Sequence, residues 1–336
     1  MTAATSFVLP DLLACSSAFK DASSPHWKRA STESRAWVNS YHVFSDRRAA
    51  FFSQGQSELL VSHAYVFAEY DEFRTICDFI NLLFVLDEIS DYQNAGDARA
   101  TGEPFLRVLR DPEWSDGSKI ALLTQDLFNR FLRSAKPNTR RHFVECCETY
   151  IEAVVEEARL REAGEILGLE DFIRLRRENS AVRCCFALIA YGLKIDFPDA
   201  IFEDPVAKQA YLAGVDMVCW ANDLYSYNME RSSGLAGNNI VTVLMQSHNI
   251  DIQAASDYAG EHYKKLMDAF LSHKARLQAA GYCDPNVLRY IEAMQHWMIG
   301  NIIWSFETPR YFGALRNQIK ETLRVPLKPM EEDMDD

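Results

Sequence analysis

Residues 211–230 read Tyr-Leu-Ala-Gly-Val-Asp-Met-Val-Cys-Trp-Ala-Asn-Asp-Leu-Tyr-Ser-Tyr-Asn-Met-Glu, a mostly apolar stretch that continues directly into oxygen-bearing side chains. The first half, residues 211–220, is apolar on nearly every face, so a helix formed by it is expected in the protein interior. Asn222, Ser226 and Glu230 then recur every fourth residue and fall on one stripe of the same helix. We therefore expect this stripe to face an internal site.

The stripe offers an amide oxygen, a hydroxyl and a carboxylate. All are hard oxygen donors, which suit Mg²⁺ better than zinc, and protein-bound Mg²⁺ typically shares phosphate oxygens of a substrate. The eight histidines show no HxxxH or HExxH spacing, which also disfavours zinc. The alternative, a polar stripe facing solvent, is disfavoured by Val218, Cys219 and Trp220 immediately before it.

A second oxygen-rich cluster, residues 87–91 (Asp-Glu-Ile-Ser-Asp), follows another apolar helical segment, residues 76–86. Asp87 and Asp91 share one helix face, where like charges repel each other and also oppose the negative end of the helix dipole. When exposed, this repulsion costs only about 0.2–0.5 kcal/mol, so a solvated acidic helix end is an open alternative for this segment alone. Behind a buried helix the cost rises unless a cation compensates.

The rest of the chain predicts one all-α domain. Its 14 Gly and 11 Pro in 336 residues are fewer than the usual ~7% and ~5%, which disfavours a turn-rich β fold. We expect an N-terminal segment over 1–25, the helical domain over 26–324 and a disordered tail over 325–336, which ends in five acidic residues. Helical periodicity predicts helices near 35–53, 57–69, 73–91, 118–135, 138–163, 169–178, 181–194, 205–231, 252–280 and 285–306.

Charge and composition exclude several classes of protein. With 35 Lys+Arg against 48 Asp+Glu the net charge is −13, which argues against nucleic-acid binding because that depends on clustered Lys and Arg. No run of about 18 apolar residues occurs and the first basic residue is Lys20, so neither a membrane span nor a signal peptide is expected. The eight cysteines lack CxxC spacing and no Asn-x-Ser/Thr sequon occurs, which favours a cytoplasmic protein. We expect a monomer or a homodimer.

Basic residues suited to a polyphosphate lie outside these two clusters. Arg176 belongs to the run 174–177 (Arg-Leu-Arg-Arg), and Arg310 with Tyr311 follows the last long helix. A protein that binds a polyphosphate through metals also needs direct donors to its oxygens, and the arginine fork supplies them. Each arginine alone is more often a surface residue, so their meaning depends on the two acidic clusters.

In this combination the sequence resembles the class I terpene synthases, and most closely the fungal sesquiterpene synthases. Residues 87–91 resemble the family's aspartate-rich motif, with Glu88 in place of the second aspartate of DDxxD. Residues 222–230 match its NDxxSxxxE metal motif at every required position. Residues 304–311 carry its terminal Arg-Tyr pair, and Arg176 stands 46 residues before the metal motif, where the family has its diphosphate-sensing arginine.

The resemblance implies a helical bundle around a central apolar cavity, with three Mg²⁺ ions and a linear isoprenyl diphosphate, most closely farnesyl diphosphate. Arg176, Arg310 and Tyr311 would stabilise the diphosphate as it leaves, and the allylic carbocation would then cyclise in a dry pocket. The activity implied is that of a sesquiterpene synthase, a carbon–oxygen lyase. The metal ligands implied are Asp87, Asp91, Asn222, Ser226 and Glu230.

The resemblance also suggests a product and a set of pocket residues. Residues 222–228 and 304–307 resemble the fungal group that closes the 1,11 ring, so a humulyl-derived product such as Δ6-protoilludene is expected first. Asn179 and Ser180 resemble the helix break that couples diphosphate binding to ionisation. Aromatic faces stabilise a carbocation by roughly 0.5–2 kcal/mol, although core packing is the alternative for each. The expected pocket residues are Phe79, Leu83, Phe84 and Trp304.

Two points remain open at the level of sequence. Met229 occupies a position where many relatives carry Lys, and Arg231 is a candidate replacement for that diphosphate contact. Whether Glu88 or Asp91 ligates metal directly is also undecided.

Two other functions fit parts of the pattern. A chain-elongating prenyltransferase would be expected to carry a second aspartate-rich motif at 222–230, and a helical scaffold would keep its acidic clusters solvated.

Overall fold

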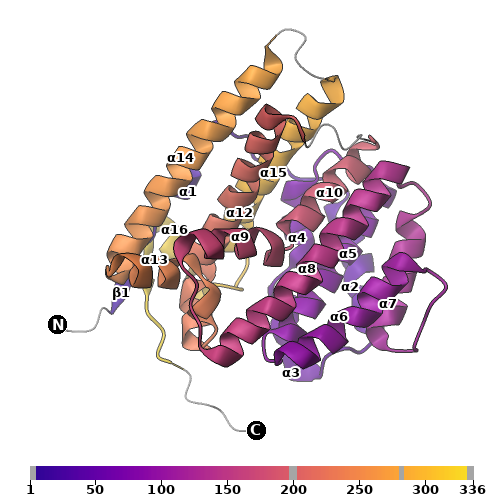
Figure 1. The fold of residues 1–336 in the computed structure, drawn as a ribbon, viewed down its shortest axis with the longest axis horizontal. Helices are drawn as coiled ribbons and strands as arrows, with labels where there is room; N and C mark the ends of the chain where they lie inside the picture. The colour runs from indigo at the N-terminus through magenta and orange to yellow at the C-terminus, as the bar shows by residue number, and fades with distance from the viewer. Residues whose placement is uncertain (1–4, 197–202, 280–283, 331–336) are drawn as a thin grey trace.

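The computed structural model describes residues 5–196, 203–279 and 284–330, and these form the predicted helical bundle (Figure 1). None of the helices in these ranges is long and apolar enough to span a lipid bilayer. The helices in chain order are α1 (Leu12–Cys15), α2 (Trp27–Ser40), α3 (Asp46–Gln54), α4 (Ser57–Ala64), α5 (Tyr70–Ser90), α6 (Ala95–Arg110), α7 (Lys119–Phe131), α8 (Pro137–Ala163), α9 (Leu169–Asn179), α10 (Val182–Leu193), α12 (Pro205–Ser232), η1 (Ala236–Asn238), α13 (Ile240–His248), α14 (Ile252–Gln278), α15 (Pro285–Glu307), η2 (Gly313–Leu315) and α16 (Arg316–Thr322).

The helices that carry the two oxygen clusters lie on different sides of the bundle. Figure 1 shows α12, α14 and α15 grouped on one side, and α5, α6, α7 and α8 on the other. Helix α12 packs on α14 and α15, α15 packs on α4, and α4 packs on α5. Helix α10 contacts α5, α8, α12 and α15 and so joins the two groups. This arrangement places the ends of α5 and α12 around a common interior.

Caps fix where the long helices of the site begin. The Asp204 side chain accepts hydrogen bonds from the backbone N–H groups of Val206 and Ala207, and Pro205 occupies the first position of α12. The same Asp-Pro pair, Asp284 with Pro285, begins α15 as the sequence predicts. A side-chain cap of this kind is worth about 1 kcal/mol, and proline is already preset for the first helical turn.

Helices α1, α6, α13 and α16 and one break were not predicted. Helix α6 contains Gly102 and Pro104, which usually interrupt helices, but a Cβ on Gly102 would lie 2.4 Å from Ile151 of α8, so the glycine permits close packing of the two helices. The expected helix 35–53 is two helices, α2 and α3, with His42 between them in the left-handed region at φ 48°.

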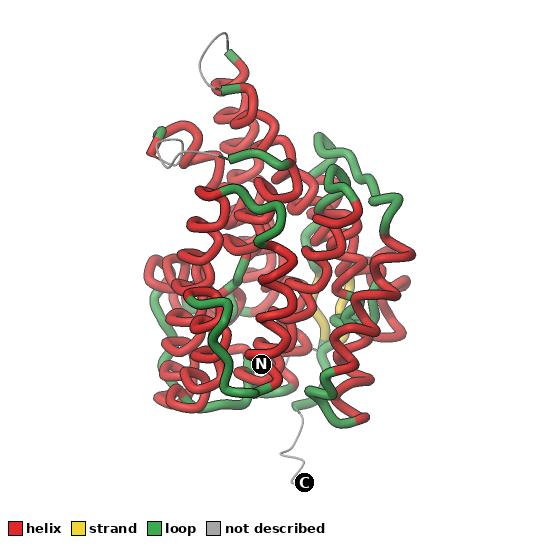
Figure 2. Tube along the Cα trace, turned by 90° about the vertical axis from the view of Figure 1, so that its right-hand side faces the viewer, coloured by secondary structure: helices red, strands yellow, loops and turns green. Residues whose placement is uncertain are grey.

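The two ends of the chain form a sheet that corrects the predicted boundaries. Strand β1 (Ser6–Val8) pairs antiparallel with β2 (Arg324–Pro326), with Phe7 opposite Val325. Both of these side chains are buried, so the tail does not begin at 325 as predicted. Figure 2 shows the two strands side by side in the perpendicular view. Strands of three residues are too short to give a periodic sequence signal. The acidic residues 331–336 lie outside the described residues.

The crossing of α15 over α4 depends on Gly300. A Cβ at this position would lie 2.7 Å from the Cβ of His63 and 3.3 Å from its carbonyl carbon, so no flexible side chain can yield. We expect Gly300→Ala to lower the free energy of unfolding by about 1–3 kcal/mol through overpacking, measured by urea denaturation. Gly237→Ala is the control because a Cβ there meets nothing within 4 Å. Equal stability of the two variants would contradict the packing explanation.

Candidate active site

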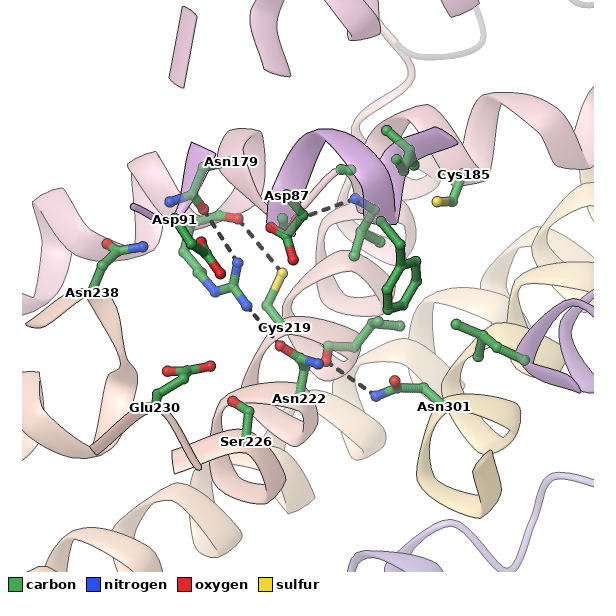
Figure 3. A pocket seen from close by; sticks show the side chains of 18 of the residues that line it. Asp87, Asp91, Asn179, Cys185, Cys219, Asn222, Ser226, Glu230, Asn238 and Asn301 are labelled. Carbon is green, nitrogen blue, oxygen red and sulfur yellow. Dashed lines mark hydrogen bonds between the residues drawn. The ribbon is translucent and has the colours of Figure 1, made fainter. Parts of the chain in front are cut away.

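A cavity of about 200 Å³ opens between the ends of α5 and α12. One part of its wall is oxygen-rich and the other is largely apolar, as Figure 3 shows with Glu230 and Asp91 on one side and Cys185 on the other. The apolar wall comprises Leu60, Ile80, Leu83, Phe84, Val182, Cys185, Val218, Trp297 and Trp304. A single space therefore offers both a polar and an apolar region to one ligand.

All five metal ligands implied by the sequence line this cavity. Asp87 and Asp91 project from the end of α5, and Asn222, Ser226 and Glu230 form the expected row on α12 (Figure 3). Glu88 does not line the cavity: its Oε1 accepts a hydrogen bond from Arg310 Nη1 at 3.1 Å. Within residues 87–91, the two aspartates therefore face the cavity, whereas the glutamate pairs with an arginine.

Desolvation and mutual repulsion destabilise the ionised form of the carboxylates in the cavity. Burial, together with the neighbouring Asp87 and Glu157, raises the pKa of Asp91 well above its usual value. Burial and the charge of Asp223 raise the pKa of Glu230 to about 7. Raised pKa values of this origin favour either protonation or a bound cation.

The donor set fits Mg²⁺ bound together with a phosphate-bearing ligand. Across the described ranges, no group of three or more His, Cys, Asp or Glu side chains is arranged to hold an ion alone. The five donors instead face one another across the cavity, and all of them are oxygen atoms. Mg²⁺ typically takes one or two carboxylates and completes its shell with water and substrate phosphates, so this arrangement suits it.

Arg176 is held beside the α12 row by hydrogen bonds to two side chains of α12. Its Nη2 donates to Asn222 Oδ1 at 2.9 Å and its Nε to Asp223 Oδ1 at 2.9 Å. Burial opposes its charged form, but the paired Asp223 raises its pKa on balance, so it stays a cation. Because the Asn222 oxygen already accepts from Arg176, a metal bound there would have to share or displace that arginine.

Arg310 and Tyr311 enter the cavity from the segment after α15. Besides Glu88, Arg310 faces Asp87, with Nη2 and Oδ2 3.8 Å apart. The Tyr311 hydroxyl accepts a hydrogen bond from Asn222 Nδ2 at 2.8 Å, and burial raises the pKa of Tyr311 to about 12, which keeps it a neutral donor. These side chains and Arg176 surround the oxygen-rich part of the cavity, as expected for groups that bind an anion.

The expected helix break lies at the cavity wall. Helix α9 ends at Asn179, Ala181 adopts φ 57°, and α10 begins at Val182. Asn179 and Ser180 both line the cavity, and Asn179 Oδ1 accepts a hydrogen bond from Arg176 Nη1 at 3.3 Å. The break therefore contacts the arginine that the resemblance assigns to diphosphate sensing.

Of the expected hydrophobic pocket residues, Phe79 lies outside the cavity wall, contrary to the prediction. It is not among the lining residues, and its ring packs against Phe143 with centroids 4.9 Å apart. Leu83, Phe84 and Trp304 do line the cavity, and the rings of the last two meet edge to face at 6.0 Å. Phe79 is core because it points from α5 toward α8 rather than toward the cavity.

The structure places Arg231, the candidate for the missing lysine, outside the cavity lining. Its Nη1 donates to the backbone carbonyl of Lys328 at 3.0 Å, and it is not among the residues that line the cavity. Met229 does line the cavity. In this structure Arg231 therefore does not take the place of the missing lysine at the cavity.

Glu157 of α8 is a cavity residue that the sequence reasoning missed. It accepts a hydrogen bond from Asn179 Nδ2 at 2.7 Å, and burial raises its pKa while Arg176 opposes that rise. Nearby, Arg161 lines the cavity and donates to the carbonyls of Ser90 and Gln93, both at 2.9 Å. The available signal was a carboxylate seven residues after the buried Tyr150, on the same face of α8.

The comparison with protein families agrees with this site. The family model described as "Terpene synthase family 2, C-terminal metal binding" matches residues 78–269, which include the acidic end of α5 and the whole of α12. The chain therefore belongs to the terpene synthase family, and the predicted class I terpene synthase is confirmed. The family description is consistent with use of a divalent metal.

Individual relatives support the same assignment. The chain is 51% identical over 326 residues to the Coprinopsis cinerea protein named linoleate 10R-lipoxygenase COP4, covering 97% of this chain and 94% of the relative. It is 50% identical over 325 residues to bifunctional terpene synthase Agr4 of Cyclocybe aegerita, with the same coverage. The crystal structure of germacradien-4-ol synthase from Streptomyces citricolor matches with a TM-score of 0.76 at 18% identity, covering 86% of this chain and 97% of that one, and so shares its fold.

The raised pKa of Glu230 predicts a pH dependence of stability. Below its ordinary value of 4.5, this carboxyl is protonated in the folded and unfolded chain alike; as pH rises toward about 7, only the folded chain keeps the proton. Without divalent cations, the stability that Glu230 contributes should therefore be lost as pH rises through about 7. We expect the melting temperature to fall less with pH in Glu230→Gln than in the wild type. Parallel pH profiles would contradict this.

Proposed function

We propose that the chain is a Mg²⁺-dependent sesquiterpene synthase that ionises farnesyl diphosphate and cyclises the resulting carbocation. The observation that carries the proposal is the facing of two oxygen clusters, on α5 and α12, across one cavity whose remaining wall is apolar. Three Mg²⁺ ions, as the resemblance implies, would supply positive charge to the departing diphosphate. Their ligands would be Asp87, Asp91, Asn222, Ser226 and Glu230.

The protein's own residues divide the remaining work. Arg176 and Arg310 would bind the diphosphate oxygens, and the neutral Tyr311 hydroxyl would donate to them. Phe84 and Trp304 present aromatic surface to the carbocation, and the apolar wall excludes the water that would quench it. The 1,11 closure to a humulyl-derived product such as Δ6-protoilludene is the proposed outcome, on the sequence resemblance alone.

The lipoxygenase name of one relative raises a different chemistry. The residues that line the cavity of this chain include no histidine, and its candidate ligands are carboxylate, amide and hydroxyl oxygens. Such donors suit Mg²⁺, whereas non-haem iron sites typically use two histidines with one carboxylate. The donor chemistry therefore favours the diphosphate reaction for this protein.

The proposal is tested by incubating the protein with farnesyl diphosphate and Mg²⁺ and identifying volatile products by gas chromatography and mass spectrometry. We expect Asn222→Ala and Glu230→Ala to lower turnover at least 100-fold, because each removes an oxygen donor from the metal row. Glu321→Ala, an exposed residue of α16, is the control with unchanged turnover. Absence of any terpene from the wild type, with this or the ten- and twenty-carbon substrates, would refute the proposal.

A helical scaffold with solvated acidic clusters is separated from the enzyme by ligand binding. If the two oxygen clusters bind Mg²⁺ and diphosphate together, the pair should raise the melting temperature, since ligand at 100 times its Kd stabilises by about 2.7 kcal/mol. We expect a rise with Mg²⁺ plus inorganic pyrophosphate, and less with either alone. Differential scanning fluorimetry measures it. The scaffold function predicts no difference among the three conditions.

A further inference from the structure

The last described residues of the chain lie against the helix that carries the metal row. Strand β2 is fixed by its pairing with β1 and by the complete burial of Val325. The chain then continues past the last turns of α12 as far as Met330. Residues 324–330 are called the C-terminal clamp below.

Asn228 is the main contact between α12 and the clamp. Its Nδ2 donates to the carbonyl of Pro326 at 3.0 Å, and its Oδ1 accepts from the backbone N–H of Lys328 at 3.0 Å. Between these two, the N–H of Leu327 donates to the carbonyl of Thr5 at 3.0 Å. The side-chain amide thus pairs with the clamp as a neighbouring strand would, on the edge opposite the N-terminal segment.

The position of Asn228 on α12 relates the clamp to the cavity. It stands two residues after Ser226 and two before Glu230, so its side chain projects about 200° around the helix from each. Those two residues line the cavity, whereas Asn228 is 5% exposed and meets the clamp. Arg231 adds a second contact, to the carbonyl of Lys328. The clamp therefore holds α12 from the side opposite the cavity.

The part of α12 that is held is the part most prone to move. The final turn of a helix frays more easily than its interior. Helix α12 ends at Ser232, so Ser226 and Glu230 lie in its last two turns. On the cavity side, Asn239 Nδ2 donates to Glu230 Oε2 at 2.9 Å. Without the clamp, the helix end would lose the hydrogen bonds that Asn228 and Arg231 make on the opposite side.

We propose that the C-terminal clamp positions the metal row, with Asn228 as the positioning residue. The identity of the ion rests on the proposed function, but the clamp itself rests on the contacts described above. Loss of the clamp frees the last turns of α12, so that Ser226 and Glu230 hold their oxygens less closely in place for Mg²⁺. The affinity for the metal then falls while the fold persists, because groups that orient metal ligands typically change affinity 10–100-fold.

Asn228→Ala in the full chain tests this directly. The half-saturating Mg²⁺ concentration is read from the melting temperature at a fixed concentration of inorganic pyrophosphate, and we expect it to rise about tenfold. Asn317→Ala, at an exposed amide of α16, is the matched control. Truncation after Leu323 should reproduce the effect without any substitution in α12, and truncation after Met330 should leave the wild-type value.

A second readout needs no ligand. Hydrogen–deuterium exchange of amides 226–232 should be at least tenfold faster in Asn228→Ala and in the truncation after Leu323, with α5 unchanged. Wild-type exchange and wild-type Mg²⁺ dependence in both variants, even with a lower melting temperature, would overturn the proposal. Loss of helical circular dichroism in both would also overturn it, since the clamp would then serve folding. A wild-type protein that ignores Mg²⁺ and pyrophosphate counts against the proposed function alone, and the exchange data still decide on the clamp.

Discussion

The mutual repulsion of carboxylates gathered around one partly buried cavity is the constraint on which the rest of the structure depends. Asp87, Asp91, Glu157 and Glu230 share one cavity, and burial raises the pKa of each. Such a cluster is unfavourable unless cations compensate it, and Mg²⁺ would do so at the moment an anionic substrate arrives. The net charge of −13 is thus compatible with the proposed binding of a diphosphate, because bound metal ions would bring the positive charge.

Two arginines of the cavity, Arg176 and Arg310, pair with carboxylates that do not line it. Asp223 is buried, pairs with Arg176 and also accepts from the backbone N–H of Ile240 at 3.0 Å. Glu88 pairs with Arg310 in a similar way, with its Oε1 3.1 Å from Arg310 Nη1. Each pairing reduces the cost of burying a charged guanidinium and fixes the direction of its fork. The acidic side chains of this chain therefore serve two separate purposes, binding cations and holding arginines.

The sequence predicted what depends on local periodicity and could not predict what depends on distant partners. The row on α12 follows from a repeat of four residues, and the structure places it in the cavity as expected. Glu157 shares a face of α8 with the buried Tyr150, but its hydrogen-bond partner Asn179 lies 22 residues away, and the β1 and β2 pairing joins residues more than 300 apart. The role of Arg231 was left open at the level of sequence for the same reason: its partner Lys328 lies 97 residues further along the chain.

The error at Phe79 shows how much of the pocket the sequence does determine. With about 100° per residue, Ile80 lies within about 20° of the direction of Asp87, whereas Phe79 lies about 80° away. Ile80 lines the cavity and Phe79 packs in the core. Choosing residues by aromatic character selected the wrong neighbour, and choosing them by angle would have selected the right one. The angular position of a residue around α5 therefore indicates whether it belongs to the apolar wall better than its aromatic character does. The shape of that wall is in this sense partly encoded in the sequence.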